Sequence, residues 1–254
     1  MTDIRTTGVI GAGQMGIGIA QVAAQAGYDV ILSDIDLPRA EKGKANIAKL
    51  LARAVEKEKI GQADADAALA RIRPVGEIAP LAEAQLVIEA ATEREEVKRA
   101  IFGNVGAILA ADAILATNTS SIPITRLAQA APDAGRFVGV HFFNPVPVMV
   151  LVEVIRGLAT TPETVAAVEA FAGKIGKTVV HAFNAPGFVV NRILLPMINE
   201  AVFVLGQSTA GIEDIDKGCR LGLNHPMGPL QLADFVGLDT CLDIIRVLHD
   251  TTGD

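Results

Sequence analysis

The chain has 254 residues, half of them hydrophobic, and a formal net charge of −7 at neutral pH. This length suffices for one large domain or for a large and a small one, and the acidic balance, the lack of Trp and the single Tyr argue against nucleic-acid binding. No apolar run reaches the roughly 18 residues of a membrane span, and Cys219 and Cys241 lack metal-ligand spacing, so we expect a cytoplasmic protein with reduced thiols and no metal.

The first predicted elements are a strand, a glycine-rich turn and a helix. Residues 1–4, Met-Thr-Asp-Ile, run directly into an apolar strand pattern at 9–10, so we expect no targeting peptide. A helical pattern covers 17–26, and a second apolar strand covers 30–32. The turn between the first strand and the helix, residues 11–16, has the form G-x-G-x-x-G. A strand before and a helix after the turn are the context of a dinucleotide-binding motif.

Each glycine of this turn has a defined purpose in such a motif. Gly11 permits the tight strand-to-helix turn, Gly13 lets the backbone approach a pyrophosphate, and Gly16 lets the helix pack closely on the strand. The free N–H groups at the start of the helix would then hold the pyrophosphate. The alternative is a glycine-rich turn without a ligand, which the matching context disfavours.

An acidic residue follows the second strand. Asp34 lies 18 residues past Gly16 and can accept hydrogen bonds from the adenosine ribose. Its charge would repel a 2′-phosphate, so the sequence predicts NAD rather than NADP. The alternative for Asp34 is a helix N-cap, and Asp36 is a rival for the ribose contact.

A long helical pattern, 37–60, follows this acidic residue. Three basic residues form a stripe along it at a spacing of four, which is one helix face: Lys49, Arg53 and Lys57. A phosphate-rich substrate tail fits such a stripe. Because glutamates are interleaved nearby, the spacing alone favours a solvated helix face.

The middle of the chain alternates apolar strand patterns with helical ones. Further strands are predicted at 86–88, 113–116, 137–140, 150–155 and 178–181, and helices at 95–110 and 163–174. This alternation predicts an α/β fold of Rossmann type, with a mostly parallel sheet covered by helices on both faces. The short Pro-rich connection after 137–140 has no room for a crossover helix, so that strand and 150–155 should be antiparallel neighbours.

Two serines, Ser120 and Ser121, follow the strand predicted at 113–116. The carboxyl end of a strand is where open α/β sheets bind ligands, so these hydroxyls are candidates for binding a substrate oxygen. The alternative is an N-cap for the helix predicted at 122–129. Both interpretations hold if one serine binds the substrate and the other caps the helix.

A histidine and a glutamate flank the Pro-rich connection. His141 follows one strand, and Glu153 lies within the next among apolar residues. A carboxylate on an apolar strand face needs a partner, and if the strands pair, His141 is available. Such a pair would hold the imidazole tautomer and make His141 a better general base. A purely structural pair that braces the connection is an equally weighted alternative.

The sequence pattern changes near residue 184. Beyond it we find no strand pattern, only helical patterns at 188–206, 212–221 and 229–249. We therefore predict two domains, 1–184 and an all-helical 185–254. Asn191, on the first of these helices, would face a cleft if the helical domain closes over the sheet, and is otherwise a surface or capping residue.

Together these segments resemble the L-3-hydroxyacyl-CoA dehydrogenase family. The resemblance spans most of the chain, and its most specific parts are the His-Phe-Phe-Asn-Pro and Pro-Gly-Phe segments. The stretches that carry it are Gly11–Gly16, Glu89–Glu93, Asn118–Ser121, His141–Met149, Pro186–Arg192 and Pro226–Pro229.

The resemblance implies a role for individual residues. His141 would be the general base and Glu153 would orient it, while Ser120 and Asn191 would hold the substrate oxygens. The resemblance also places the coenzyme A tail near the helix that carries Lys49, Arg53 and Lys57. The residues it implies for NAD binding are Gly11, Gly13, Gln14, Met15, Gly16, Asp34, Glu93, Lys98, Asn118, Ser120 and Asn144.

The implied reaction is the reversible NAD-dependent oxidation of (S)-3-hydroxyacyl-CoA to 3-oxoacyl-CoA, with 3-hydroxybutyryl-CoA as the expected substrate. The resemblance also implies a homodimer formed through the helical domain. Chains of the family continue past the position of Asp254, which predicts that this helical domain is incomplete. The rival hypotheses are an NAD-binding protein without turnover and a dehydrogenase of free 3-hydroxy acids. The second typically uses a catalytic Lys that we do not find at the start of the helical domain.

Overall fold

A computed structural model describes residues 3–253, and it divides the chain into two compact units, 1–184 and 185–254. Met1, Thr2 and Asp254 lie outside the described residues, as does the part of the N-terminal expectation that concerns them. Each unit is built around its own set of buried hydrophobic side chains.

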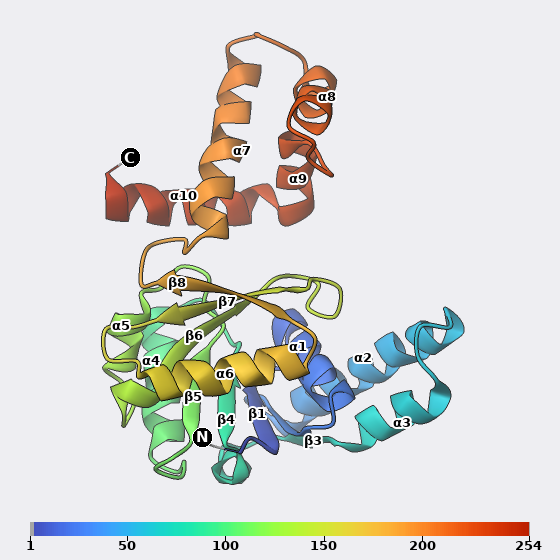
Figure 1. Cartoon of the computed structure of the whole chain (residues 1–254), viewed down its shortest axis with the longest axis vertical. Helices are drawn as coiled ribbons and strands as arrows, with labels where there is room; N and C mark the ends of the chain where they lie inside the picture. The colour runs from blue at the N-terminus through green and yellow to red at the C-terminus, as the bar shows by residue number, and fades with distance from the viewer. Residues whose placement is uncertain (1–2, 254) are drawn as a thin grey trace. The chain divides into compact units, whose positions relative to one another are not determined.

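The first unit contains one eight-stranded sheet with helices between its strands (Figure 1). Its strands are β1 Thr6–Ile10, β2 Asp29–Ser33, β3 Ile72–Val75, β4 Leu86–Glu89, β5 Ile114–Thr117, β6 Phe137–Phe142, β7 Leu151–Arg156 and β8 Thr178–Phe183. Its helices are α1 Gln14–Gln25, α2 Leu37–Glu56, α3 Gln62–Ala70, α4 Glu95–Gly106, α5 Ile124–Ala128 and α6 Pro162–Lys174, with short 3₁₀ turns at Ala79–Glu83 and Ala134–Arg136.

The strand order is β3-β2-β1-β4-β5-β6-β7-β8, and neighbouring strands are parallel except for β6 and β7. This arrangement confirms the predicted α/β fold with a mostly parallel sheet. The antiparallel pairing of β6 and β7 is also confirmed. The reversal between β1 and β4, where the order changes direction, is the point at which open α/β sheets bind ligands.

Both faces of the sheet are covered because strand residues alternate between them. On one face, Val9 and Ile88 belong to a buried cluster that includes Ile19 of α1 and Phe171 of α6. On the other face, Phe137 packs edge-on against Phe102 of α4, with ring centroids 4.9 Å apart. The sheet is thereby packed between two layers of helices, and it supports the loops that follow the carboxyl ends of its strands.

Two elements of this unit were not predicted from the sequence, namely helix α3 and strand β3. The long helix predicted over 37–60 ends at Glu56. Strand β3 contains Arg73 and Pro74, which interrupt its apolar pattern. Proline is tolerated there because β3 is an edge strand, where a missing N–H leaves no neighbour unpaired.

The second unit is helical, with α7 Val190–Gly206, α8 Ile212–Gly222, α9 Pro229–Val236 and α10 Leu238–Thr252. The single helix predicted over 229–249 is wrong, because Gly237 adopts φ +101° and separates α9 from α10. The Asp216 carboxylate of α8 accepts hydrogen bonds from the backbone N–H groups of Leu230 and Gln231, which caps the start of α9. The free cysteines Cys219 and Cys241 lie in α8 and α10.

None of the helices in the described part of the chain is both long and apolar enough to cross a lipid bilayer.

Candidate active site

The glycine-rich turn links β1 to α1 in a geometry that only glycine tolerates at two of its positions. Gly11 has φ +99°, and a Cβ there would lie 2.5 Å from the carbonyl oxygen of Ala90. A Cβ on Gly16 would lie 1.7 Å from the carbonyl oxygen of Gly11. In contrast, a Cβ on Gly13 would meet no atom within 4 Å. Two glycines are therefore required by the protein itself, while Gly13 borders open space at the start of α1.

Asp34 braces this turn from the end of β2. Its Oδ2 accepts a 2.7 Å hydrogen bond from the backbone N–H of Ala12, and its Oδ1 accepts a 2.8 Å bond from that of Ile35. Asp36 instead caps α2 by accepting from the backbone N–H of Arg39. The N-cap alternative considered for Asp34 thus applies to Asp36.

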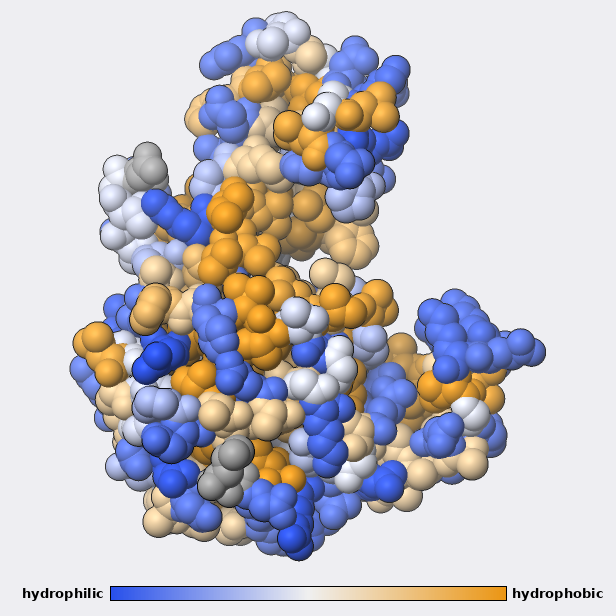
Figure 2. Space-filling view, in the orientation of Figure 1, coloured by the Kyte–Doolittle hydropathy of each residue, from blue (hydrophilic) through white to orange (hydrophobic). Residues whose placement is uncertain are grey.

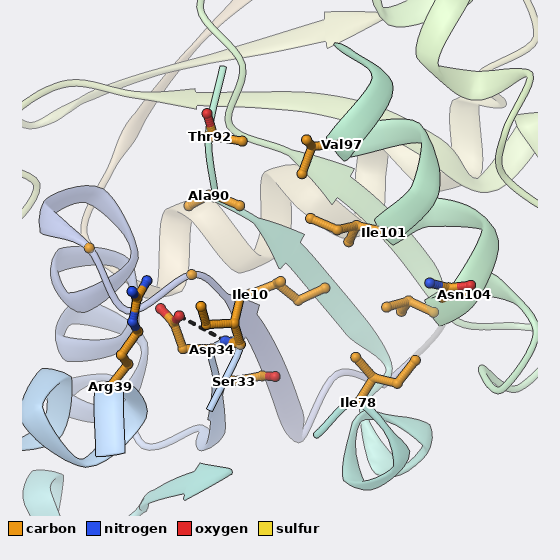
Figure 3. A pocket seen from close by; sticks show the side chains of 15 residues that line it. Ile10, Ser33, Asp34, Arg39, Ile78, Ala90, Thr92, Val97, Ile101 and Asn104 are labelled. Atoms are coloured by element: carbon orange, nitrogen blue, oxygen red, sulfur yellow. Dashed lines mark hydrogen bonds between the residues drawn. The ribbon is translucent and has the colours of Figure 1, made fainter. Parts of the chain in front are cut away.

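A cavity of about 420 Å³ opens beside the turn. Figure 3 shows Asp34 and Arg39 on one side of it, and Val97, Ile101 and Asn104 of α4 on the other. Its walls are mostly hydrophobic, with a carboxylate at one end, which suits a flat heterocycle attached to a sugar. Gly11, Gly13 and Asp34 of this lining were predicted from the sequence. Arg39 and the lining residues of α4 were not, because no local motif marks them.

A buried ion pair lies where β4 ends. Lys98 of α4 is 1 % exposed, and its Nζ lies 2.8 Å from both carboxylate oxygens of Glu89, which is fully buried. The hydroxyl of Thr117, on the neighbouring strand β5, donates to Glu89 at 2.7 Å. Buried charges persist in proteins only when they are paired and hydrogen-bonded in this way. Glu89 and Thr117 are residues to which sequence reasoning assigned no role.

Glu93 contacts both Lys98 and the loop of residues 118–121 after β5, here called the serine loop. One oxygen of its carboxylate lies 3.3 Å from Lys98 Nζ, and the other accepts hydrogen bonds from Thr119, Ser120 and Ser121. Partial burial raises the pKa of the Glu93 carboxyl, but the Lys98 charge and the hydrogen bonds from Thr119 and Ser120 outweigh it and hold the pKa below its ordinary value. Glu93 is therefore ionised at neutral pH.

The N-cap alternative for the two serines is wrong. The helix after them, α5, begins at Ile124, and its N-cap is Pro123, with no side-chain capping bond. The hydroxyls of Ser120 and Ser121 instead point to Glu93, at 3.4 and 3.2 Å. Nearby, Asn118 Oδ1 accepts from the backbone N–H of Phe142 at 2.9 Å and ties the serine loop to the end of β6.

His141 and Glu153 form a second buried pair. They are direct partners in the register of β6 and β7, and His141 Nδ1 lies 2.7 Å from Glu153 Oε2. The two side chains are 8 % and 0 % exposed. A carboxylate at this distance would accept a proton carried on Nδ1, and Nε2 would then be the ring nitrogen that exchanges protons. The Phe143 ring packs against the imidazole, with centroids 4.6 Å apart.

The connection between β6 and β7 is fixed at several points. Val146 is buried and lies so close to α1 that a Cβ on Gly18 would approach it within 2.8 Å. The Lys177 ammonium donates to the carbonyl oxygens of Val146 and Met149, at 2.5 and 2.7 Å, and burial lowers the pKa of this lysine. Asn144, which follows His141 in this connection, is exposed.

The remaining candidate residues belong to other elements. Lys49, Arg53 and Lys57 are all exposed, and Lys57 lies one residue past the end of α2. Asn191 is buried in the first turn of α7 and belongs to the second unit. Among residues 3–253, no group of three or more His, Cys, Asp or Glu side chains is arranged to hold a metal ion.

Comparisons with known proteins match the whole chain. Residues 6–185 match the family model for the NAD-binding domain of 3-hydroxyacyl-CoA dehydrogenase, and residues 187–254 match the model for its C-terminal domain. The 3-hydroxybutyryl-CoA dehydrogenase of Bradyrhizobium diazoefficiens is 52% identical over 99% of this chain and 86% of its own length.

Two further relatives extend this picture. A crystal structure of the (S)-3-hydroxybutyryl-CoA dehydrogenase of Ralstonia eutropha superposes with a TM-score of 0.97 at 51% identity, covering 99% of this chain and 89% of that one. The 3-hydroxyadipyl-CoA dehydrogenase of Escherichia coli is 43% identical over 94% of this chain and 50% of its own length.

Proposed function

The chain belongs to the 3-hydroxyacyl-CoA dehydrogenase family, and we propose that its substrate is (S)-3-hydroxybutyryl-CoA, oxidised reversibly to acetoacetyl-CoA. The family makes it an NAD-dependent dehydrogenase of 3-hydroxyacyl-CoA thioesters. The choice of the 3-hydroxybutyryl group follows relatives named for that substrate. The observation that carries the chemistry is the buried contact between His141 and Glu153.

The glycine-rich turn and the cavity beside it fit NAD. The open space at Gly13, next to the N–H groups that begin α1, suits a pyrophosphate, and Gln14, Met15 and Gly16 continue that turn into the helix. Asp34 offers a carboxylate to the ribose at the cavity wall. We assign further cofactor contacts to Glu93, Lys98, Asn118, Ser120 and Asn144, as the resemblance implies.

His141 acts as the proton carrier. When bound, NAD supplies the acceptor for the hydride that leaves C3 of the substrate. In the oxidation, His141 takes the proton of the 3-hydroxyl through Nε2, and Glu153 stabilises the imidazolium that forms. In the reduction, the same imidazolium returns the proton to the alkoxide.

Two residues hold the substrate oxygens in this proposal. Ser120 donates its hydroxyl from the carboxyl end of β5, and Asn191 offers its side-chain amide from α7. Hydrogen-bond donors held next to an oxygen on which negative charge develops lower the barrier of such a reaction.

The exposed basic stripe of Lys49, Arg53 and Lys57 is proposed to hold the phosphates of coenzyme A. We also propose a homodimer formed through the helical unit. Large hydrophobic side chains are exposed on that unit, among them Ile193, Phe203, Leu221 and Phe235. Figure 2 shows hydrophobic residues interleaved with hydrophilic ones over its helices. Exposed hydrophobic surface of this kind is typical of protein interfaces.

The test is the oxidation of NADH by acetoacetyl-CoA, with free acetoacetate as a second substrate. We expect turnover with the thioester, and we expect His141→Gln to lower kcat by roughly 10²–10⁴-fold while leaving NADH binding intact. His181 provides a matched control, because it forms a 2.6 Å pair with Glu169 but is 54 % exposed. His181→Gln should retain the wild-type rate.

Other outcomes would contradict the proposal. Faster turnover of free acetoacetate would indicate a dehydrogenase of free 3-hydroxy acids. NADH binding without turnover of either substrate would indicate a protein that binds the cofactor without catalysis.

A further inference from the structure

One oxygen of Glu93 collects hydrogen bonds from three consecutive residues of the serine loop. Its Oε1 accepts from the hydroxyl of Thr119 at 2.5 Å, from the backbone N–H of Ser120 at 2.9 Å and from the hydroxyl of Ser121 at 3.2 Å. The backbone N–H of Ser121 also points to this oxygen, at 3.3 Å. A single carboxylate oxygen therefore defines the shape of the segment 119–121.

The other carboxylate oxygen of Glu93 contacts a buried lysine. Its Oε2 lies 3.3 Å from Lys98 Nζ, and Lys98 is fixed by both oxygens of the fully buried Glu89. Two carboxylates share one ammonium, so the group carries excess negative charge. The N–H and O–H donors of the serine loop offset that excess. The loop is thus attached to the rigid core of the sheet by charge and not by packing alone.

The bonds to Ser120 differ in length in a way that matters for its role. Its backbone N–H lies 2.9 Å from Glu93, whereas its hydroxyl oxygen lies 3.4 Å away, at the limit of a hydrogen bond. Glu93 therefore fixes the main chain of Ser120 firmly and its hydroxyl only weakly. A substrate oxygen has to compete with one long hydrogen bond to recruit that hydroxyl.

We infer that Glu93 is a positioning residue for Ser120, in addition to any contact it makes with the cofactor. The carboxylate fixes the main chain of the serine loop so that the Ser120 hydroxyl is presented to the substrate oxygen. The Glu89–Lys98 pair keeps that carboxylate ionised and in place. This inference rests on the proposed role of Ser120 in binding a substrate oxygen.

The experiment is a double-mutant cycle of Glu93→Gln and Ser120→Ala, assayed with acetoacetyl-CoA at saturating NADH. If Glu93 acts through Ser120, Glu93→Gln lowers kcat/KM at least about tenfold in the wild-type background but less than about twofold in the Ser120→Ala background. The dissociation constant of NADH, measured by fluorescence, should change by a smaller factor than kcat/KM does, because loss of a cofactor contact alone would not depend on Ser120. Glu96→Gln is the matched control, because Glu96 lies in α4 and its ion-pair partner is the exposed Arg94.

A second variant protects the test against misfolding of Glu93→Gln. Thr119→Val removes the shortest donor to Glu93 without changing any charge, and we expect the same loss of kcat/KM, again only when Ser120 is present. Thr119→Ser, which restores a hydroxyl, should recover most of the activity.

Two outcomes would overturn the inference. In one, the effects of Glu93→Gln and Ser120→Ala multiply, which would mean that the residues act independently. In the other, weaker NADH binding accounts for the whole loss, which would make Glu93 a cofactor contact alone. Absence of turnover in the wild-type protein would instead refute the proposed function and the inference with it, so the two failures are distinguishable.

Discussion

His141 and Glu153 face each other directly across the antiparallel β6–β7 pair, with Nδ1 2.7 Å from Oε2. The other strand pairs described within residues 3–253 are parallel, and a short connection brings these two consecutive strands into antiparallel register. The Glu153 side chain is fully buried, and the His141 side chain is 8 % exposed.

The first prediction concerns this pair. Glu153→Gln keeps the shape of the side chain but removes the charge that orients Nδ1–H and stabilises the imidazolium. We expect kcat to fall by roughly 10²–10⁴-fold, the range seen when a base is removed or held in the wrong tautomer. Stopped-flow measurement of the hydride-transfer step would check this. An unchanged rate would mean that the pair only braces the strands.

The second prediction concerns cofactor choice. Asp34→Ser removes a charge that would repel a 2′-phosphate, so we expect the ratio of kcat/KM for NADPH to that for NADH to rise at least about tenfold. The NADH value itself should fall, because the Asp34 bond to Ala12 that braces the glycine-rich turn is lost. Asp36→Ser is the control, since serine also caps helices. If Asp36→Ser changes the ratio and Asp34→Ser does not, the assignment of the ribose contact is reversed.

The third prediction distinguishes a glycine needed for cofactor binding, Gly13, from a glycine needed for folding, Gly16. Gly13→Ala should leave the melting temperature almost unchanged, because the added Cβ meets only open space in the protein. It should weaken NADH binding, because that open space is where we propose the pyrophosphate lies. Gly16→Ala should destabilise the protein by several kcal/mol or prevent folding, because its Cβ would overlap the carbonyl oxygen of Gly11. Calorimetry with and without NADH distinguishes the two. Equal melting temperatures for both variants would contradict the prediction.

The fourth prediction is a pH dependence of stability. The pKa of Glu93 is lower in the folded protein than in the unfolded chain, so between the two values the unfolded chain binds more protons and stability rises with pH. The stabilisation is fully present at pH values above the unfolded pKa and is lost as the pH falls through the lower, folded pKa. The difference in melting temperature between wild type and Glu93→Gln should therefore be constant near neutral pH and shrink in acid. A difference that persists undiminished in acid would show that charge is not its cause.

Much of the fold could be predicted because its signals are local. The β1–α1–β2 unit follows from a glycine pattern flanked by apolar segments, and the antiparallel β6–β7 pair follows from a connection too short for a crossover helix. Strand β3 was missed because its pattern is broken by Arg73 and Pro74, which only an edge position tolerates. The break at Gly237 was missed because helical periodicity does not register a single residue with positive φ.

The sequence by itself predicted the family, the glycine-rich turn and, provided that β6 and β7 pair, the contact between His141 and Glu153, since each depends on spacing along a few consecutive residues or across one short loop. Only the tertiary structure decided that Glu93 binds the serine loop, that Glu89 and Lys98 anchor it, and that α4 walls the cavity beside Asp34. These contacts join β4, α4 and the end of β5, segments brought together by packing of the sheet. That packing decides which residue pairs with a buried charge, and the periodicity of the sequence does not predict it.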